Sequence, residues 1–198
     1  MIRSFSLADF FTLANAASGT IAIFLCLSYL DEHVRTYVWV AFGLLPVALA
    51  CDILDGTIAR WRRKHSPLGA DLDSLADVVS FGVAPAVLGF TLGLRGAWDM
   101  VALVYFVACG ISRLARYNVT ASSLSDASGK VKYYEGTPIP TSLLLVLVLG
   151  ILFGTGRVHD QIWLGAVRIG PGTLHPLSLM FFVSGSAMVS ATLRIPKP

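Results

Sequence analysis

Five aspartates stand close together in a part of the chain that is otherwise apolar: Asp52, Asp55, Asp71, Asp73 and Asp77. A charged carboxylate at the centre of a bilayer costs about 2.5–3.5 kcal/mol on insertion scales, so several at helical spacing require a compensating cation. Oxygen ligands without histidine or cysteine suit Mg²⁺ or Mn²⁺ and argue against zinc. The cluster therefore predicts a divalent-metal site inside a membrane protein.

The spacing of the acids predicts that four of them converge. Asp52 and Asp55 are three residues apart, and Asp73 and Asp77 are four apart, so each pair shares one face of a helix. Residues 61–68 between the pairs are basic and contain a proline, which indicates a hairpin link at the membrane surface. Over eight residues at 1.5 Å each, Asp52 and Asp77 are both about 12 Å from that link. An antiparallel hairpin then places Asp52 level with Asp77, and Asp55 level with Asp73.

Small residues next to the first acid pair predict a smooth helix face. Gly56 and Ala59 lie one turn apart and leave room for a flat ligand, although small residues also serve packing between membrane helices. Arg60 could meet a phosphate or anchor the helix end. Asp71 is about 200° around its helix from Asp73, so we expect it to point elsewhere.

The whole arrangement resembles the motif of the CDP-alcohol phosphotransferase family. The matching run is Asp52-x2-Asp55-Gly56-x2-Ala59-Arg60-x8-Gly69-x3-Asp73-x3-Asp77, in which every fixed position of the motif is present. The segments 72–85, 112–118 and 135–140 resemble the phosphatidylserine synthase branch of that family. The resemblance extends over most of the chain and is strongest from 52 to 140.

This resemblance implies a metal-dependent transfer reaction on a CDP-activated lipid. Two divalent cations, Mg²⁺ or Mn²⁺, would be held by Asp52, Asp55, Asp73 and Asp77. The last aspartate of the motif, Asp77, is the expected general base, although position alone does not separate it from Asp73. The nucleotide is expected to contact Asp52, Gly56, Ala59, Arg60 and Gly69, and Asn15 of the first apolar run is a further expected contact.

Two arginines at the end of another apolar run form a candidate substrate pocket. Arg113 and Arg116 are three residues apart on one helix face. They could be anchors that reach the membrane surface, or a paired guanidinium site for a carboxylate or phosphate. The resemblance favours the second interpretation, with serine carboxylate or lipid phosphate as ligand. Asn118 could complete the pocket, and Glu135 could pair with an ammonium group or an arginine, or with neither.

Composition places the chain in the membrane. Its 198 residues are 55% hydrophobic and 14% charged, with a mean hydropathy of +0.71, whereas soluble domains carry about 25% charged residues. We expect a single membrane domain over residues 1–198. The net charge of +3 suits anionic lipid, and no nucleic-acid motif is present. No metal-ligand spacing involves the cysteines and histidines: Cys26, Cys51, Cys109, His33, His65, His159 and His175.

The apolar runs predict an all-α integral membrane protein with six transmembrane helices and a short N-terminal interfacial helix at residues 1–7. Thr12, Asn15 and Gly19 form a small and polar stripe on the first run, which either packs against other helices or lines the nucleotide site. The six predicted spans are residues 8–30, 37–62, 69–94, 98–118, 140–157 and 175–194.

The basic residues predict the orientation of the spans. Eleven lysines and arginines lie on the side of the termini and of the acidic hairpin's turn, against four on the other. Cytoplasmic loops carry the excess of such residues. We therefore expect both termini and the active site at the cytoplasmic face of a plasma or inner membrane.

The expected reaction is transfer of a phosphatidyl group from CDP-diacylglycerol, or from a CDP-linked ether lipid, to the hydroxyl of L-serine, with release of CMP. Glycerol phosphate or inositol phosphate could be the acceptor instead. A cation transporter that uses the acidic cluster as its ion site is a further alternative, and a non-catalytic membrane subunit is the last. The resemblance also implies a homodimer.

Overall fold

The computed structural model describes residues 7–62, 67–120 and 133–196. Within these segments the side chains of residues 60, 62, 67, 120, 133–135 and 194–196 are outside the description. The predicted interfacial helix, apart from Leu7, the centre of the basic link and most of the 120–134 loop thus lie outside the described residues. The chain divides into two compact units, Met1–Ala84 and Pro85–Pro198.

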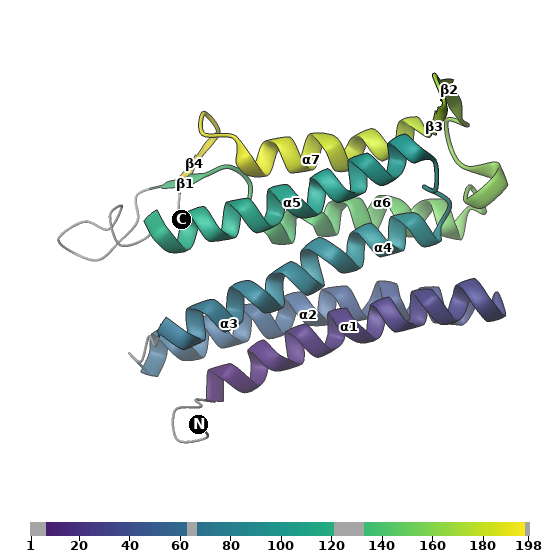
Figure 1. The fold of residues 1–198 in the computed structure, drawn as a ribbon. Coiled ribbons are helices and arrows are strands. Elements are labelled where there is room, and N and C mark those ends of the chain that lie inside the picture. Colours follow the sequence, from purple (N-terminus) through teal and green to yellow (C-terminus); the bar gives the residue numbers. More distant parts are fainter. Residues whose placement is uncertain (1–6, 63–66, 121–132, 197–198) are drawn as a thin grey trace. The chain divides into compact units, whose positions relative to one another are not determined.

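The first unit is built from long apolar helices that lie side by side (Figure 1). Helix α1 turns through a two-residue link into α2, and the third helix of the unit packs against α1. The buried positions of α1 recur every three or four residues, so the small and polar stripe faces its neighbouring helices. The elements are α1 (Leu7–Glu32), α2 (Arg35–Arg62), α3 (Pro67–Asp77) and the π-helical turn η2 (Val78–Val83).

The π-helical turn directly follows the last aspartate of the motif. Pro85 has no N–H to donate to a carbonyl four residues back, and just before it the Ala84 N–H donates to the carbonyl of Val79, five residues back. On the facing helix, a Cβ at Gly19 would lie only 2.7 Å from Ser80 Cα. A glycine therefore allows α1 to approach η2 more closely than any other residue would.

The second unit is held together by aromatic packing between two helices. Phe106 of α5 meets Phe181 of α7 edge to face, with ring centroids 5.3 Å apart, and Tyr105 stacks on Phe182 at 4.6 Å. A glycine in α7, Gly185, lies against the backbone of Phe106. The helices are α4 (Ala84–Thr91), whose first residue belongs to the first unit, α5 (Ala97–Thr120), α6 (Leu143–Gly154) and α7 (Leu179–Val189), with 3-10 turns at Ile139–Ser142, His159–Gln161 and Pro176–Ser178.

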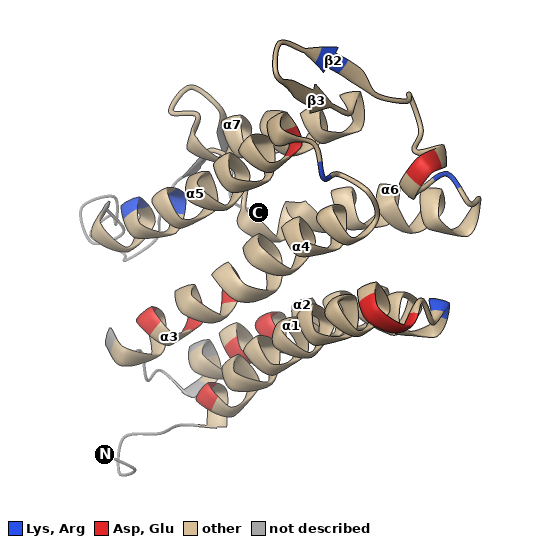
Figure 2. Ribbon diagram, turned by 45° about the vertical axis from the view of Figure 1, so that its right-hand side comes forward, with Lys and Arg blue, Asp and Glu red and all other residues tan. Residues whose placement is uncertain are grey.

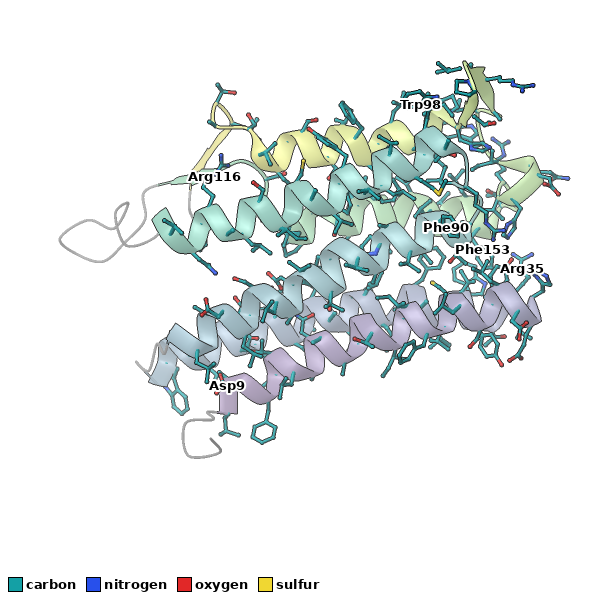
Figure 3. The ribbon with its side chains drawn as sticks, viewed as in Figure 1. Asp9, Arg35, Phe90, Trp98, Arg116 and Phe153 are labelled. Atoms are coloured by element: carbon teal, nitrogen blue, oxygen red, sulfur yellow. The ribbon has the colours of Figure 1, made fainter. Side chains whose placement is uncertain are left out.

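Two short antiparallel ribbons add to the expected all-helical architecture. The first pairs β1 (Tyr133–Glu135) with β4 (Arg194–Pro196), so that Glu135 stands opposite Arg194. The second pairs β2 (Val167–Ile169) with β3 (Gly172–Leu174) in the link between α6 and α7. Trp98, at the start of α5, donates its indole N–H to the carbonyl of Ile169 and ties this ribbon to the helix (Figure 3).

A buried carboxylate fastens the same link to α5. Asp99 is fully buried and accepts hydrogen bonds from the backbone N–H groups of Gly96 and His175, at 2.9 and 2.8 Å. The His175 ring nitrogen Nδ1 lies 2.5 Å from the same carboxylate. These hydrogen bonds join the start of α5 to the segment that precedes α7, so Asp99 acts as a structural anchor.

Four described helices are long and apolar enough to cross a membrane: Leu7–Glu32, Arg35–Ala59, Leu68–Thr91 and Ala97–Val119. They coincide as candidate spans with the first four predicted spans, and the third of them ends at residue 91 and not at 94. The last two predicted spans correspond to shorter apolar helices, Ile139–Gly154 and Pro176–Val189. These end early because Thr155 departs from helical geometry and Ser190 adopts an extended backbone.

Candidate metal and active site

Three aspartates from two helices meet in the first unit. Asp52 and Asp55 lie on α2 and Asp73 lies on α3, and each offers a carboxylate oxygen within 4.8 Å of the other two. Figure 2 shows acidic segments of α3 and of its neighbouring helices near one end of this unit. The convergence that the spacing predicted is therefore present for these three residues.

The donor set fits a hard divalent cation. Two ionised carboxylates 4.8 Å apart repel by about 3–4 kcal/mol at an effective dielectric constant of about 20, so three in one place need positive charge. Asp73 Oδ1 is buried, and no hydrogen-bond partner for it is found among the described residues. An orphaned carboxylate oxygen beside two further carboxylates matches the all-oxygen coordination of Mg²⁺ and Mn²⁺. Asp52, Asp55 and Asp73 are thus able to hold such an ion.

The fourth acid, Asp77, lies one helical turn beyond Asp73, outside the group of three. It is 7% exposed and interacts electrostatically with Asp52 and Asp73. The side-chain amide of Asn15, on α1, donates to Asp77 Oδ1 at 3.2 Å. Ser80 in turn donates its hydroxyl to the backbone carbonyl of Asn15 at 2.8 Å. Asn15, expected at the nucleotide, is in this structure a hydrogen-bond partner of the predicted base.

A second polar residue of α1 contacts the group of three. The Thr12 hydroxyl donates to Asp55 Oδ2 at 2.6 Å, and both side chains are buried, at 3% and 5% exposure. Asp9 lies one turn before Thr12, is also buried, and interacts electrostatically with Asp55 (Figure 3). Helix α1 therefore forms part of the acidic site.

The predicted nucleotide residues lie on the two helices that carry the acids. Gly56 and Ala59 follow Asp55 on α2, and a Cβ at Gly56 would meet nothing within 4 Å. Gly69 lies one turn before Asp73 on α3. Arg60 is in the last turns of α2, with its side chain outside the description. Asp71 is exposed, as its angular position predicted.

The candidate serine-pocket residues belong to the second unit. Arg113 is only 8% exposed, and its guanidinium lies 5.8 Å from the centre of the Tyr117 ring. Arg116 donates to the carbonyl of Val189 near the end of α7, at 3.4 Å (Figure 3). Asn118 is exposed, at the end of α5. Glu135 is in β1, and its side chain lies outside the description.

Three contacts of the site were not identified from sequence: the Thr12 bond to Asp55, the Asn15 bond to Asp77 and the Ser80 bond to α1. The available signal was the spacing of Asp9, Thr12 and Asn15, three residues apart on one apolar helix. A run of polar residues on one face of a membrane helix indicates a buried partner. It does not identify that partner, because the bonded residues are 43, 62 and 65 positions apart in the chain.

Comparison with known proteins supports the assignment of the motif. The chain is 42% identical over 201 residues to a CDP-diacylglycerol–serine O-phosphatidyltransferase of Saccharomyces cerevisiae, covering 100% of this chain and 73% of the relative. Relatives with the same name from Methanocaldococcus jannaschii and Helicobacter pylori are 33% and 34% identical, over 78% and 95% of this chain and 72% and 70% of their own lengths. The sequence profile of the CDP-alcohol phosphatidyltransferases matches residues 5–184. The chain, with its motif aspartates gathered on apolar helices, belongs to the CDP-alcohol phosphatidyltransferase family.

Proposed function

We propose that this protein transfers the phosphatidyl group of CDP-diacylglycerol, or of an ether-linked analogue, to the hydroxyl of L-serine. The products are phosphatidylserine and CMP. The observation that carries the proposal is the convergence of Asp52, Asp55 and Asp73 at the spacing of the family motif. The relatives' name, CDP-diacylglycerol–serine O-phosphatidyltransferase, supports serine as the acceptor.

Four aspartates would hold the metal, which we propose to be two Mg²⁺ or Mn²⁺ ions: Asp52, Asp55, Asp73 and Asp77. When bound, such ions neutralise the diphosphate and stabilise the departing CMP. The carboxylates supply the opposite charge and keep the lipid phosphorus at the level of α2 and α3. Asp55 and Asp77 are buried, which limits the access of water that would compete with serine as the nucleophile.

Asp77 is the proposed general base. The serine Oγ–phosphorus bond forms as the bond from phosphorus to the CMP oxygen breaks, and the serine hydroxyl proton passes to Asp77. Support comes from the burial of Asp77 and from its bond to Asn15, which holds one carboxylate oxygen at 3.2 Å. A base held in one orientation lowers the entropy cost of reaching the reactive geometry.

The nucleotide would lie along the smooth face beside the acids. Open space at Gly56 and the small side chain of Ala59 leave room for a flat ring. Gly69 lets the backbone of α3 approach it, and Arg60 would meet a phosphate. Asn15 would reach the nucleotide through its Oδ1, which is buried and finds no hydrogen-bond partner among the described residues.

Serine would be bound by Arg113 and Arg116, with Asn118 and Glu135 completing the pocket. The burial of Arg113 supports this assignment, because an arginine that only anchors a helix end extends toward the membrane surface. Buried guanidinium groups suit carboxylate ligands. Arg116 also donates a hydrogen bond to the backbone carbonyl of Val189 in α7.

We further propose a single domain of six spans, with both termini and the active site at the cytoplasmic face. The apolar character of Ile139–Gly154 and Pro176–Val189 supports the last two spans. The excess of lysine and arginine on one side supports the orientation. The homodimer rests on family resemblance alone.

The direct test is CMP release from a CDP-lipid by the purified protein in detergent, with Mn²⁺ or Mg²⁺ present. L-Serine, glycerol phosphate and inositol phosphate are supplied in turn. Release that requires both serine and metal supports the proposal. Release only with a phosphorylated acceptor retains the chemistry and refutes serine. Folded protein that carries metal across liposomes and releases no CMP would instead be a cation transporter.

A further inference from the structure

Thr12 lies outside the family motif, yet it contacts a motif aspartate. Its hydroxyl has two acceptors within reach: Asp55 Oδ2 at 2.6 Å, and the Ala8 carbonyl of its own helix at 3.2 Å. A hydroxyl has one proton to donate. The shorter distance is in the range of a hydrogen bond from a hydroxyl to an ionised carboxylate, so the proton points at Asp55.

Burial makes this hydrogen bond effective. Thr12 is 3% exposed and Asp55 is 5% exposed, so water does not replace the hydroxyl when it is removed. A carboxylate can rotate about its last side-chain torsion, which has broad preferences. A donor that holds Oδ2 restricts that rotation, together with the backbone hydrogen bond from Gly56 to the same carboxylate, and thereby sets the direction of the other oxygen. Asp55 then presents this oxygen to an ion without losing further conformational freedom.

We propose that Thr12 is a positioning residue of the metal centre: it orients the Asp55 carboxylate for a divalent cation. The inference rests on the proposed metal-dependent function and deepens it. Residues that hydrogen-bond to metal ligands, without touching the metal, typically alter metal affinity by about 10–100-fold when they are replaced. Thr12→Val retains the shape of the side chain and removes the donor. We expect it to weaken Mn²⁺ binding by about tenfold or more.

The same helix supplies a matched control. Thr20 lies two turns further along α1, and its hydroxyl donates to the carbonyl of Ala16, within its own helix, at 2.8 Å. Thr20→Val therefore makes the same chemical change without touching a carboxylate. Thr12→Ser keeps the hydroxyl and should restore Mn²⁺ affinity to within about twofold of the original chain.

The experiment measures Mn²⁺ binding to the full-length protein in detergent, without substrate, from the paramagnetic resonance signal of free Mn²⁺. Thermal unfolding and size exclusion establish that each variant is folded. Weakened binding in Thr12→Val alone, with a matching rise in the Mn²⁺ concentration needed for CMP release, supports the proposal. Saturating Mn²⁺ should then recover most of the maximal rate.

Unchanged Mn²⁺ affinity in folded Thr12→Val would overturn the inference, and so would an equal loss in Thr20→Val. Thr12→Ala replaces Thr12→Val if the latter does not fold. If neither folds, the affinity of Thr12→Ser decides, since a loss there means that the hydroxyl does not suffice. Original protein that binds Mn²⁺ but releases no CMP with serine would refute the proposed reaction and leave the role of Thr12 intact.

Discussion

At the residue scale, the distinctive feature is that neighbouring carboxylates on one short helix have different surroundings. Asp73 is half-buried with one orphaned oxygen, whereas Asp71, two residues earlier on α3, is exposed. Helical geometry separates them, because two positions along a helix correspond to about 200° of rotation. The same side chain can therefore be a metal ligand at one position and a solvated charge at the other.

Replacing Asp73 by asparagine should abolish activity while the same change at Asp71 should not. Asp73→Asn removes one negative charge from the group of three, and we expect Mn²⁺ affinity and CMP release each to fall by about 100-fold or more. Asp71→Asn should stay within about threefold of the original rate. The assay is serine-dependent CMP release at several Mn²⁺ concentrations. Equal losses in the two variants would show that overall charge matters, and not coordination.

At the scale of elements, the site depends on how closely α1 approaches the π-helical turn. Ser80 bonds the backbone of Asn15, and Asn15 bonds Asp77, so contact between these elements is transmitted to the proposed base. Gly19 permits that contact because it has no Cβ. π-Helical turns are rare and occur frequently at functional sites, and this one begins immediately after Asp77.

Gly19→Ala should therefore destabilise the protein although alanine favours helices. The added methyl would lie 2.7 Å from Ser80 Cα, and overpacking of this kind costs about 1–3 kcal/mol. Gly43→Ala, on α2, is the control, because its Cβ would meet nothing within 4 Å. We expect a lower Tm in detergent for Gly19→Ala, and an unchanged or higher Tm for Gly43→Ala. A Tm for Gly19→Ala equal to that of the original chain would disprove the close approach.

A second glycine, Gly136, allows the segment after β1 to lie directly against the end of α7. Gly136 has a φ of +74°, and its N–H donates to the carbonyl of Leu193. A Cβ there would collide with the Met188 carbonyl oxygen and lie 2.9 Å from its carbonyl carbon. The neighbouring Thr137 N–H donates to Ala187. The backbone around Glu135 is thus held against the end of α7.

Gly136→Ala should lower stability more than Gly156→Ala does. The two glycines share nearly the same positive φ, +74° and +73°, so backbone strain of about 1–2 kcal/mol applies to both. A Cβ at Gly156 meets nothing within 4 Å, so the extra loss of Tm in Gly136→Ala measures the collision with α7. If Glu135 contributes to the serine pocket, the KM for serine should rise in Gly136→Ala alone. Identical Tm values for Gly136→Ala and Gly156→Ala would contradict the close contact between this segment and α7.

At the scale of the whole molecule, the number of spans decides on which side each link lies. Ile139–Gly154 and Pro176–Val189 are shorter than the roughly 20 residues of a typical span. If both cross, the link that carries β2 and β3 lies outside. If neither crosses, that link would lie on the same side as the end of α5, which its bonds to Trp98 and Asp99 at the start of α5 contradict when α5 itself spans.

Accessibility of introduced cysteines should distinguish these topologies. In a chain whose Cys26, Cys51 and Cys109 have been replaced, we expect Arg168→Cys to react with an impermeant maleimide in intact cells. Asp31→Cys, at the exposed end of α1, is the external control. Trp61→Cys, at the exposed end of α2, should react only after permeabilisation. Protection of Arg168→Cys in intact cells would mean that the last two helices do not span.

The sequence alone predicts much of this protein, because its strongest signals are local. Four of the six apolar runs are helices long and apolar enough to cross a membrane, because length and composition are properties of the local sequence. The convergence of Asp52, Asp55 and Asp73 follows from helical spacing on two arms of one short hairpin. In such a hairpin, counting residues from the turn sets the depth of each side chain.

Long-range packing determines the rest. The Thr12 bond to Asp55 and the fit of Gly19 against Ser80 join residues far apart in the chain, and no local pattern specifies which side chains meet. The burial of Arg113 follows from the packing within the second unit, and a spacing of three residues is compatible with a pocket or a surface anchor alike. From sequence, Asp99 likewise resembles an ordinary acid in the first turn of a helix, and only the folded chain brings His175 next to it. Spacing places the carboxylates, and packing selects the groups that orient them.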